Sequence, residues 1–259
     1  CPSSGCSDWD YDVNISLLHN TGKIDTVVSR IDTLSTSPLV TDTIWKYNKV
    51  YNPFEMGRYI TPYGSYMNKR NAGYGTAGFD SNWRHTFIYD VTDFAMLLKD
   101  SVLIRSNYRG WSSGFQCTID FVFVEGTPAR KVLSIQNLYT SGGTYTTTEE
   151  FESKRMPGKK LAIPANAKDA SLKVIITGHG ADKNNGCGEF CDKLYFLKVN
   201  DQVLDTVRMW RDDCGITAVK PQGGTWIFDR ANWCPGDKIY PFFHPLKKFL
   251  IPGDSLLLD

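Results

Sequence analysis

Two acidic residues lie beside cysteines in short, loop-like stretches of the sequence. Asp10 ends the stretch CSDWD, and Glu189 lies inside CGEFC. Paired carboxylates suit a hydrolase, because one can activate water or attack while the other donates a proton or holds the substrate. We therefore interpret Asp10 and Glu189 as a candidate acid pair on two loops at a cleft. The alternative for either residue is a solvated surface charge, the usual role of a loop carboxylate.

Aromatic residues accompany these acids. Trp9 and Phe190 each neighbour one acid, and Trp233 follows Arg230 in the stretch DRANWC. Aromatic faces beside acids are typical of sugar-binding clefts, which favours the functional interpretation. Tryptophan and phenylalanine nevertheless serve more often as core residues than as ligand platforms.

The seven cysteines constrain the same stretches. Six lie in loop-like sequence, whereas Cys117 lies in an apolar run that predicts a buried strand. Six loop cysteines and one core cysteine fit three disulfides in an oxidising compartment. A disulfide closing a loop as short as 1–6 or 187–191 would contribute about 2 kcal/mol on the chain-entropy model, so its clearer effect is to fix a tight loop beside an acid. Spacing alone leaves a purely stabilising role open.

A zinc site is the main alternative for the cysteines. Only Cys187 and Cys191 have the spacing of a zinc knuckle, and the four histidines are scattered along the chain. Structural zinc needs further closing ligands, and a thioredoxin-like redox role needs Cys-x-x-Cys. We therefore expect no metal and no redox motif.

Composition narrows the classes of partner. The 259 residues carry a net charge of +1, with 29 basic and 28 acidic side chains. This balance gives no reason to expect nucleic acid or an anionic membrane as partner. No stretch approaches the ~20 apolar residues of a membrane span. The sequence starts at a cysteine and shows no signal peptide, so we interpret it as a mature or trimmed chain.

Strands are the main elements expected to position these residues. Val, Ile, Tyr, Phe and Thr dominate six segments bounded by turn residues. The six segments are 11–18, 57–63, 85–91, 117–124, 170–178 and 193–200. One helix is predicted over 92–100, with Thr92 as its N-cap, and 140–155 is predicted to be an exposed loop. This pattern predicts an all-β sandwich or jelly roll, and the turn at Gly126 predicts two domains, 1–127 and 128–259.

In combination, the unusual segments resemble the peptide-N-glycosidase F family, secreted bacterial amidases that remove N-linked glycans from asparagine. The matching pieces run from residue 1 to residue 236 in the family's order: CPSSGCSDWD, EMGRYITPY, DVTDF, VEGTP, GCGEFC and DRANWCPG. The resemblance implies two adjacent antiparallel jelly rolls with the active site in the cleft between them. It also implies disulfides Cys1–Cys6, Cys187–Cys191 and Cys214–Cys234, and neither metal nor cofactor.

The resemblance also carries site residues over by position. Asp10 and Glu189 fall on the two essential acids, and Arg230 falls on an arginine near them. His179 lies in a segment that matches one lining the cleft. Trp9 and Trp233 are then expected to support a sugar platform.

One position departs from the family pattern. The family has a further glutamate in the region where this chain has no acid between Arg105 and Cys117. Asn107 or Tyr108 falls nearest to it, in an alignment that needs a one-residue gap. A neutral residue there favours the competing interpretation, a non-catalytic N-glycan or carbohydrate-binding protein on the same fold. In addition, Tyr11 replaces the basic residue that follows the aspartate in the family.

The family's jelly rolls extend beyond both ends of this sequence. We therefore expect that outer strands are missing from the chain at both ends. A longer precursor, or a second chain or segment, would complete the jelly rolls, because proteins normally cover or pair an open sheet edge.

The resulting hypothesis is a hydrolase that cleaves the amide between asparagine and the first GlcNAc of an N-linked glycoprotein or glycopeptide, converting Asn to Asp. The protein is expected to be secreted by a bacterium, or to lie in its periplasm or at its cell surface. Two other enzyme classes were weighed, and the four scattered histidines argue against the second of them. A glycoside hydrolase would cut between sugars, and a copper monooxygenase would need clustered His and Met ligands.

Overall fold

The computed structural model describes residues 7–64, 83–111, 115–139, 143–180 and 188–259. These residues form antiparallel sheets, which confirms the all-β prediction. The strands are β1 (Asp12–Thr36), β2 (Leu39–Ile60), β3 (Leu103–Tyr108), β4 (Lys159–Ala162), β5 (Ser171–Val174), β6 (Lys193–Val199), β7 (Gln202–Met209), β8 (Phe242–Pro245) and β9 (Ser255–Leu258). They form three sheets with the orders β2-β1-β3, β4-β9-β6-β7 and β5-β8. The jelly-roll topology itself stays a prediction.

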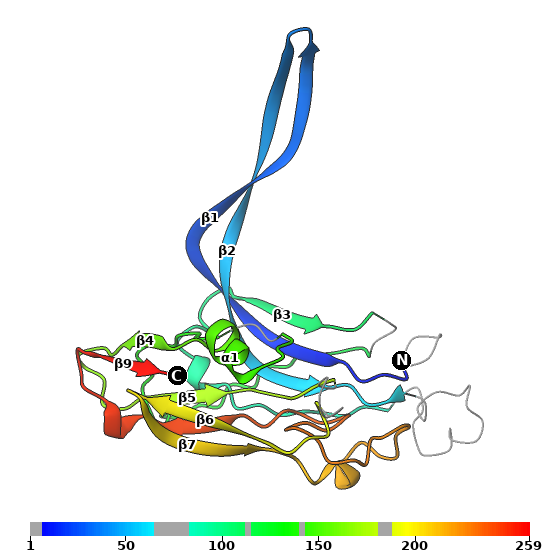
Figure 1. Cartoon of the computed structure of the whole chain (residues 1–259), viewed down its shortest axis with the longest axis vertical. Coiled ribbons are helices and arrows are strands. Elements are labelled where there is room, and N and C mark those ends of the chain that lie inside the picture. The colour runs from blue at the N-terminus through cyan, green and yellow to red at the C-terminus, as the bar shows by residue number, and fades with distance from the viewer. Residues whose placement is uncertain (1–6, 65–82, 112–114, 140–142, 181–187) are drawn as a thin grey trace.

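The first hairpin is much longer than the sequence pattern predicted. Strand β1 pairs with β3 only over Val13–Leu18, close to the body of the molecule. Beyond that point β1 and β2 continue alone and project from the body as a two-stranded arm (Figure 1). No residue from His19 to Tyr51 is buried. The arm was missed because its apolar side chains face no core, so their spacing follows no burial pattern.

Separate hydrophobic clusters support the sheets. One contains Leu17, Phe54, Met56 and Phe94 at the base of the arm. A second lies under the sheet β4-β9-β6-β7 and contains Ile163, Ala167, Leu197, Val199, Leu246, Leu256 and Leu258. The sheet β2-β1-β3 lies before residue 127 and the other two lie after it. The domain boundary at 127/128 nevertheless stays a prediction, as do the missing outer strands.

A third cluster joins the amino-terminal sheet to the carboxyl-terminal half. Ile60, Trp233 and Ile239 pack together with at most 2% of their surface exposed. Next to them, Ile60 N–H donates to the Asp237 carbonyl at 3.0 Å, and Ile239 N–H donates to the Arg58 carbonyl at 2.8 Å. The end of β2 is therefore bonded directly to the segment that follows Trp233.

Two predicted strands do not form. Segments 85–91 and 117–124 have no assigned secondary structure. Cys117 is exposed rather than buried, and Val122, Phe123 and Val124 are 79–87% exposed. High β-propensity describes side chains that suit a pleated surface, and it does not supply a neighbouring strand. Within the described residues, these segments have no strand partner.

Two further elements differ from expectation. The helix predicted over 92–100 is only a 3-10 turn, Thr92–Phe94. Its N-cap is Val91 rather than the predicted Thr92, and the Asp90 carboxylate accepts the Thr92 N–H at 2.9 Å. Conversely, the predicted loop 140–155 contains α1 (Thr148–Glu150) and η3 (Phe151–Arg155). The Thr147 hydroxyl accepts the Glu150 N–H, and the Glu150 carboxylate accepts the Thr146 N–H, close to a capping-box arrangement. No helix in the described part of the chain has the length and apolarity needed to span a membrane.

Candidate active site

Three loops meet through backbone hydrogen bonds around Glu189. Gly178 N–H donates to the Ala231 carbonyl at 3.0 Å, and Ala231 N–H donates to the Glu189 carbonyl at 2.8 Å. Glu189 N–H in turn donates to the Gly180 carbonyl at 3.0 Å. This ladder fixes the backbone of Glu189 between two segments that precede and follow it in the sequence.

Glycine at position 188 permits this close approach. A Cβ atom added at Gly188 would lie 2.3 Å from the Gly180 carbonyl oxygen and 2.7 Å from the His179 carbonyl oxygen. Real Cβ contacts are almost never that short, and backbone atoms cannot turn away as a flexible side chain can. The glycine before Glu189 is therefore a steric requirement of the site.

The segment that carries Asp10 is fastened to the end of β2. Tyr11 N–H donates to the Thr61 hydroxyl at 2.8 Å, and Thr61 N–H donates to the Tyr11 carbonyl at 2.9 Å. Gly64 N–H donates to the Ser7 carbonyl at 2.7 Å. Asp10 lies between these anchors and is partly buried, so the sheet β2-β1-β3 determines where its carboxylate sits.

Arg230 connects the two halves of the site. Its side chain is fully buried, and its terminal nitrogens donate to the Phe228 carbonyl at 2.7 Å, the Thr225 hydroxyl at 2.9 Å and the Tyr63 hydroxyl at 3.2 Å. The guanidinium carbon lies 4.8 Å from the ring centre of Phe190, and the same distance separates it from the ring of Trp233. Cation–π contacts of this kind help to compensate a desolvated guanidinium.

The pKa of Glu189 depends on burial and on two charged neighbours, Arg230 and Asp10. Its Oε1 lies 3.9 Å from Arg230 Nε, a buried nitrogen without a hydrogen-bond partner among the described residues. Burial raises the pKa of Glu189, the Arg230 cation lowers it, and the Asp10 carboxylate raises it further. Asp10 also acts to raise the pKa of Tyr63, which burial raises most. The Asp10 carboxylate thus acts on the pKa of Glu189 although 179 positions separate the two residues in the sequence.

His179 lies beside the same groups. Its ring stacks on Trp233 with 4.8 Å between ring centres, and its Nε2 lies 2.9 Å from the Thr177 hydroxyl. Desolvation lowers the pKa of His179 to about 4, while Asp10 acts in the opposite direction. The residue as a whole is exposed to solvent, and solvent moderates this lowering. The direction follows from the packed ring face and from three nearby arginine cations, and it favours the neutral imidazole at neutral pH.

The remaining sequence-predicted residues lie in different surroundings. Trp9 is 64% exposed, whereas Trp233 is fully buried and donates its indole N–H to the Gly178 carbonyl at 2.7 Å. Trp233 therefore supports Arg230 and His179, and a direct contact with substrate stays a prediction. Asn107 lies on β3 opposite Asn14 of β1, whose side chain is buried. The specific roles assigned to these residues are likewise still predictions.

Sequence reasoning missed two hydroxyl groups that hold the arginine, those of Tyr63 and Thr225. Tyr63 ends the stretch EMGRYITPY, so its motif was a usable signal. Thr225 had no signal, because only the fold brings it to the guanidinium of Arg230.

The structure contains the disulfide Cys214–Cys234, with Cα atoms 5.1 Å apart. Cys191 is also disulfide-bonded. Its expected partner Cys187, together with Cys1 and Cys6, lies outside the described residues. Asp213, Cys214 and Cys234 are the one group in the described part of the chain with mutually close metal-ligating atoms. Because both thiols form the disulfide, they are not available as thiolate ligands.

Comparison with known proteins finds similarity to peptide-N-glycosidase F proteins. Residues 144–251 match the family model "Peptide-N-glycosidase F, C terminal". The chain is 25% identical over 250 residues to peptide-N(4)-(N-acetyl-beta-D-glucosaminyl)asparagine amidase F of Elizabethkingia miricola. That alignment covers 91% of this chain and 58% of the relative, so the chain spans a little over half of the relative's length.

Solved structures show the same fold. A crystal structure of peptide-N(4)-(N-acetyl-beta-D-glucosaminyl)asparagine amidase superposes with a TM-score of 0.64 at 21% identity, covering 100% of this chain and 73% of that one. PNGase F from Flavobacterium meningosepticum superposes with a TM-score of 0.60 at 20% identity, again over 100% and 73% of the two chains. PNGF-II superposes with a TM-score of 0.57 at 16% identity over 97% and 49%. The chain therefore shares the fold of these structures and is similar in sequence to a peptide-N-glycosidase F protein over most of its own length.

Proposed function

We propose that this protein hydrolyses the amide between asparagine and the first GlcNAc of N-linked glycoproteins or glycopeptides. The observation that carries the proposal is the position of Glu189, whose Oε1 lies 3.9 Å from the buried Arg230 guanidinium and whose pKa is also raised by the Asp10 carboxylate from a distant part of the chain. The similarity to an asparagine amidase supports the same reaction class. The disulfide Cys214–Cys234 supports a protein of an oxidising compartment, which for the proposed bacterial protein means secreted, periplasmic or at the cell surface.

The reaction requires attack of water on the side-chain amide carbon of asparagine. The water oxygen forms a bond to that carbon, the carbon–nitrogen bond breaks, and the nitrogen leaves with a proton as the glycosylamine. The peptide product is aspartate. Asp10 is assigned as the principal acid/base group at the amide, because it reaches the site from an anchored, partly buried segment.

Glu189 is assigned to hold or polarise the water or the amide. Burial raises its pKa, which favours the protonated carboxyl, a hydrogen-bond donor, at a higher pH than for an exposed glutamate. Arg230 acts through Glu189 as a positioning residue, since its terminal nitrogens already donate to protein oxygens. Neutral His179 and exposed Trp9 are assigned to the sugar side of the site.

Mass measurement of the peptide product tests the reaction. After incubation with an N-glycopeptide, conversion of Asn to Asp marks the amidase. A GlcNAc retained on the asparagine would show a glycosidase instead, and an unchanged glycopeptide would show a binder. Asp10→Asn should abolish conversion while leaving the melting temperature unchanged. Asp8→Asn, which removes an exposed carboxylate two residues away, is the matched control and should remain active.

A non-catalytic carbohydrate-binding protein is the second candidate. It is favoured by the neutral Asn107 at the position nearest to the family's third acid. Full conversion of a glycopeptide by the wild type, lost in Asp10→Asn, would reject it.

A further inference from the structure

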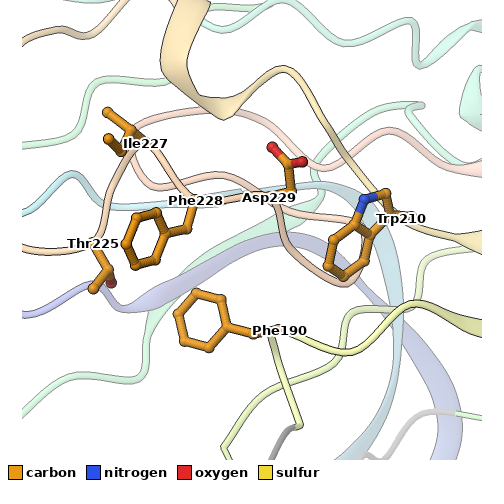
Figure 2. Close-up of a pocket in the computed structure, with 6 residues that line it drawn as sticks. All are labelled: Phe190, Trp210, Thr225, Ile227, Phe228 and Asp229. Carbon is orange, nitrogen blue, oxygen red and sulfur yellow. The ribbon is translucent and has the colours of Figure 1, made fainter.

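An open hollow lies next to Glu189 and Arg230, and the proposed reaction does not use it. It has a volume of about 570 Å³ and is lined by Phe190, Trp210, Thr225, Ile227, Phe228 and Asp229. Figure 2 shows three aromatic side chains around this space, together with the carboxylate of Asp229. Two of the lining residues, Phe190 and Asp229, are the immediate chain neighbours of Glu189 and Arg230.

The aromatic walls are open to solvent yet held in place. Phe190 is 41% exposed and Phe228 is 52% exposed, although large apolar side chains usually gain by burial. Their ring centres are 6.1 Å apart at an interplanar angle of 76°, a stable edge-to-face arrangement. Phe190 is further fixed from behind by the buried Arg230 guanidinium. These two rings therefore form a preformed apolar wall with free ring surface.

The charges around the hollow favour a cation. Asp229 is the one charged side chain among the residues that line the hollow. Arg208 is affected by the Asp229 carboxylate, but it donates to the Asp192 carboxylate at 2.8 Å. The neighbouring Arg230 guanidinium is fully buried and donates to three protein oxygens, so the exposed Asp229 supplies the charge that the hollow presents to solvent. Ring faces attract organic cations, and a carboxylate adds a charge-assisted hydrogen bond.

We propose that this hollow binds a substituted ammonium or guanidinium group, held between aromatic rings and the Asp229 carboxylate. A lysine or arginine side chain of the peptide near the glycosylated asparagine is the occupant that fits its place beside Glu189. That assignment to the substrate rests on the proposed function, whereas binding of the cation in the hollow does not. A neutral sugar ring would use the aromatic faces but would not need the negative charge of Asp229.

A methyl NMR titration tests the proposal, with the Ile227 side chain as a reporter inside the hollow. The probes are N-acetyl-lysine methylamide, its neutral isostere N-acetyl-norleucine methylamide, and GlcNAc. The lysine probe is expected to bind about fivefold to thirtyfold more tightly than the norleucine probe. Asp229→Asn should reduce this ratio to below about twofold. Asp212→Asn, which makes the same charge change without lining the hollow, should leave it above about fivefold.

Equal affinity for the lysine and norleucine probes would overturn the proposal, as would an unchanged ratio in Asp229→Asn. A shift of the Ile227 methyl resonances by GlcNAc alone would assign the hollow to sugar and overturn it as well. Because these probes carry no glycan on asparagine, the outcome is separate from the proposed function. Lysine binding without any glycopeptide conversion would support the cation site and reject the amidase.

Discussion

Replacing Gly188 by alanine is expected to damage activity far more than stability. The new Cβ would lie 2.3 Å from the Gly180 carbonyl oxygen, whereas ordinary contacts begin at 3.4 Å. The backbone around Glu189 must therefore move by roughly 1 Å, at a cost of about 1–3 kcal/mol for overpacking. For a chain of this size the melting temperature should fall by roughly 2–12 °C. A 1 Å misplacement of a catalytic group costs about 100-fold in rate.

The assay combines thermal unfolding with turnover of an N-glycopeptide at 25 °C or below, where the variant remains folded. Gly215→Ala is the matched control, because its Cβ would meet its nearest neighbour, Ile227, at an ordinary 3.9 Å. That variant should match the wild type in both measurements. If Gly188→Ala also keeps the wild-type melting temperature and turnover, the close backbone approach beside Glu189 is wrong.

Three further predictions concern the charges and the arm. Arg230→Met should lower the free energy of unfolding by about 3–5 kcal/mol in urea denaturation, because it removes the buried partner of Glu189. Arg30→Met on the exposed arm is the control and should leave the free energy of unfolding unchanged. A loss below about 1 kcal/mol for Arg230→Met would contradict this role. The pKa of His179, followed by NMR, should lie below its ordinary value of 6.5, and Asp10→Asn should lower it further. Since the folded pKa is the lower one, the His179 contribution to stability is complete above pH 6.5 and is lost as pH falls toward about 4; a measured pKa of 6.5 or more would refute the assignment. Replacing Asn20–Tyr51 by a two-residue turn should change the melting temperature by less than about 2 °C, because an unsupported two-stranded hairpin adds little stability. A large fall in the melting temperature would mean that the body depends on the arm.

The fold class could be predicted because β-branched and aromatic residues alternate with polar ones between frequent turns. The confirmed strands around 11–18 and 193–200 carry this pattern. Segments 85–91 and 117–124 carry it too, yet neither forms a strand in the described structure. A strand needs a neighbour with matching hydrogen bonds, and the identity of that neighbour is a property of the whole fold.

The candidate site shows the same division. The sequence by itself predicted Asp10, Glu189 and Arg230 as site residues, because cysteine, glycine and aromatic residues around them formed recognisable motifs. It also identified the pair Cys214 and Cys234 through the family resemblance. Only the tertiary structure decided that Arg230 is buried, that Tyr63 and Thr225 hold it, and that Phe190 and Phe228 leave an open hollow beside it. The physical reason is that burial and electrostatic coupling depend on distances between segments that are far apart along the chain.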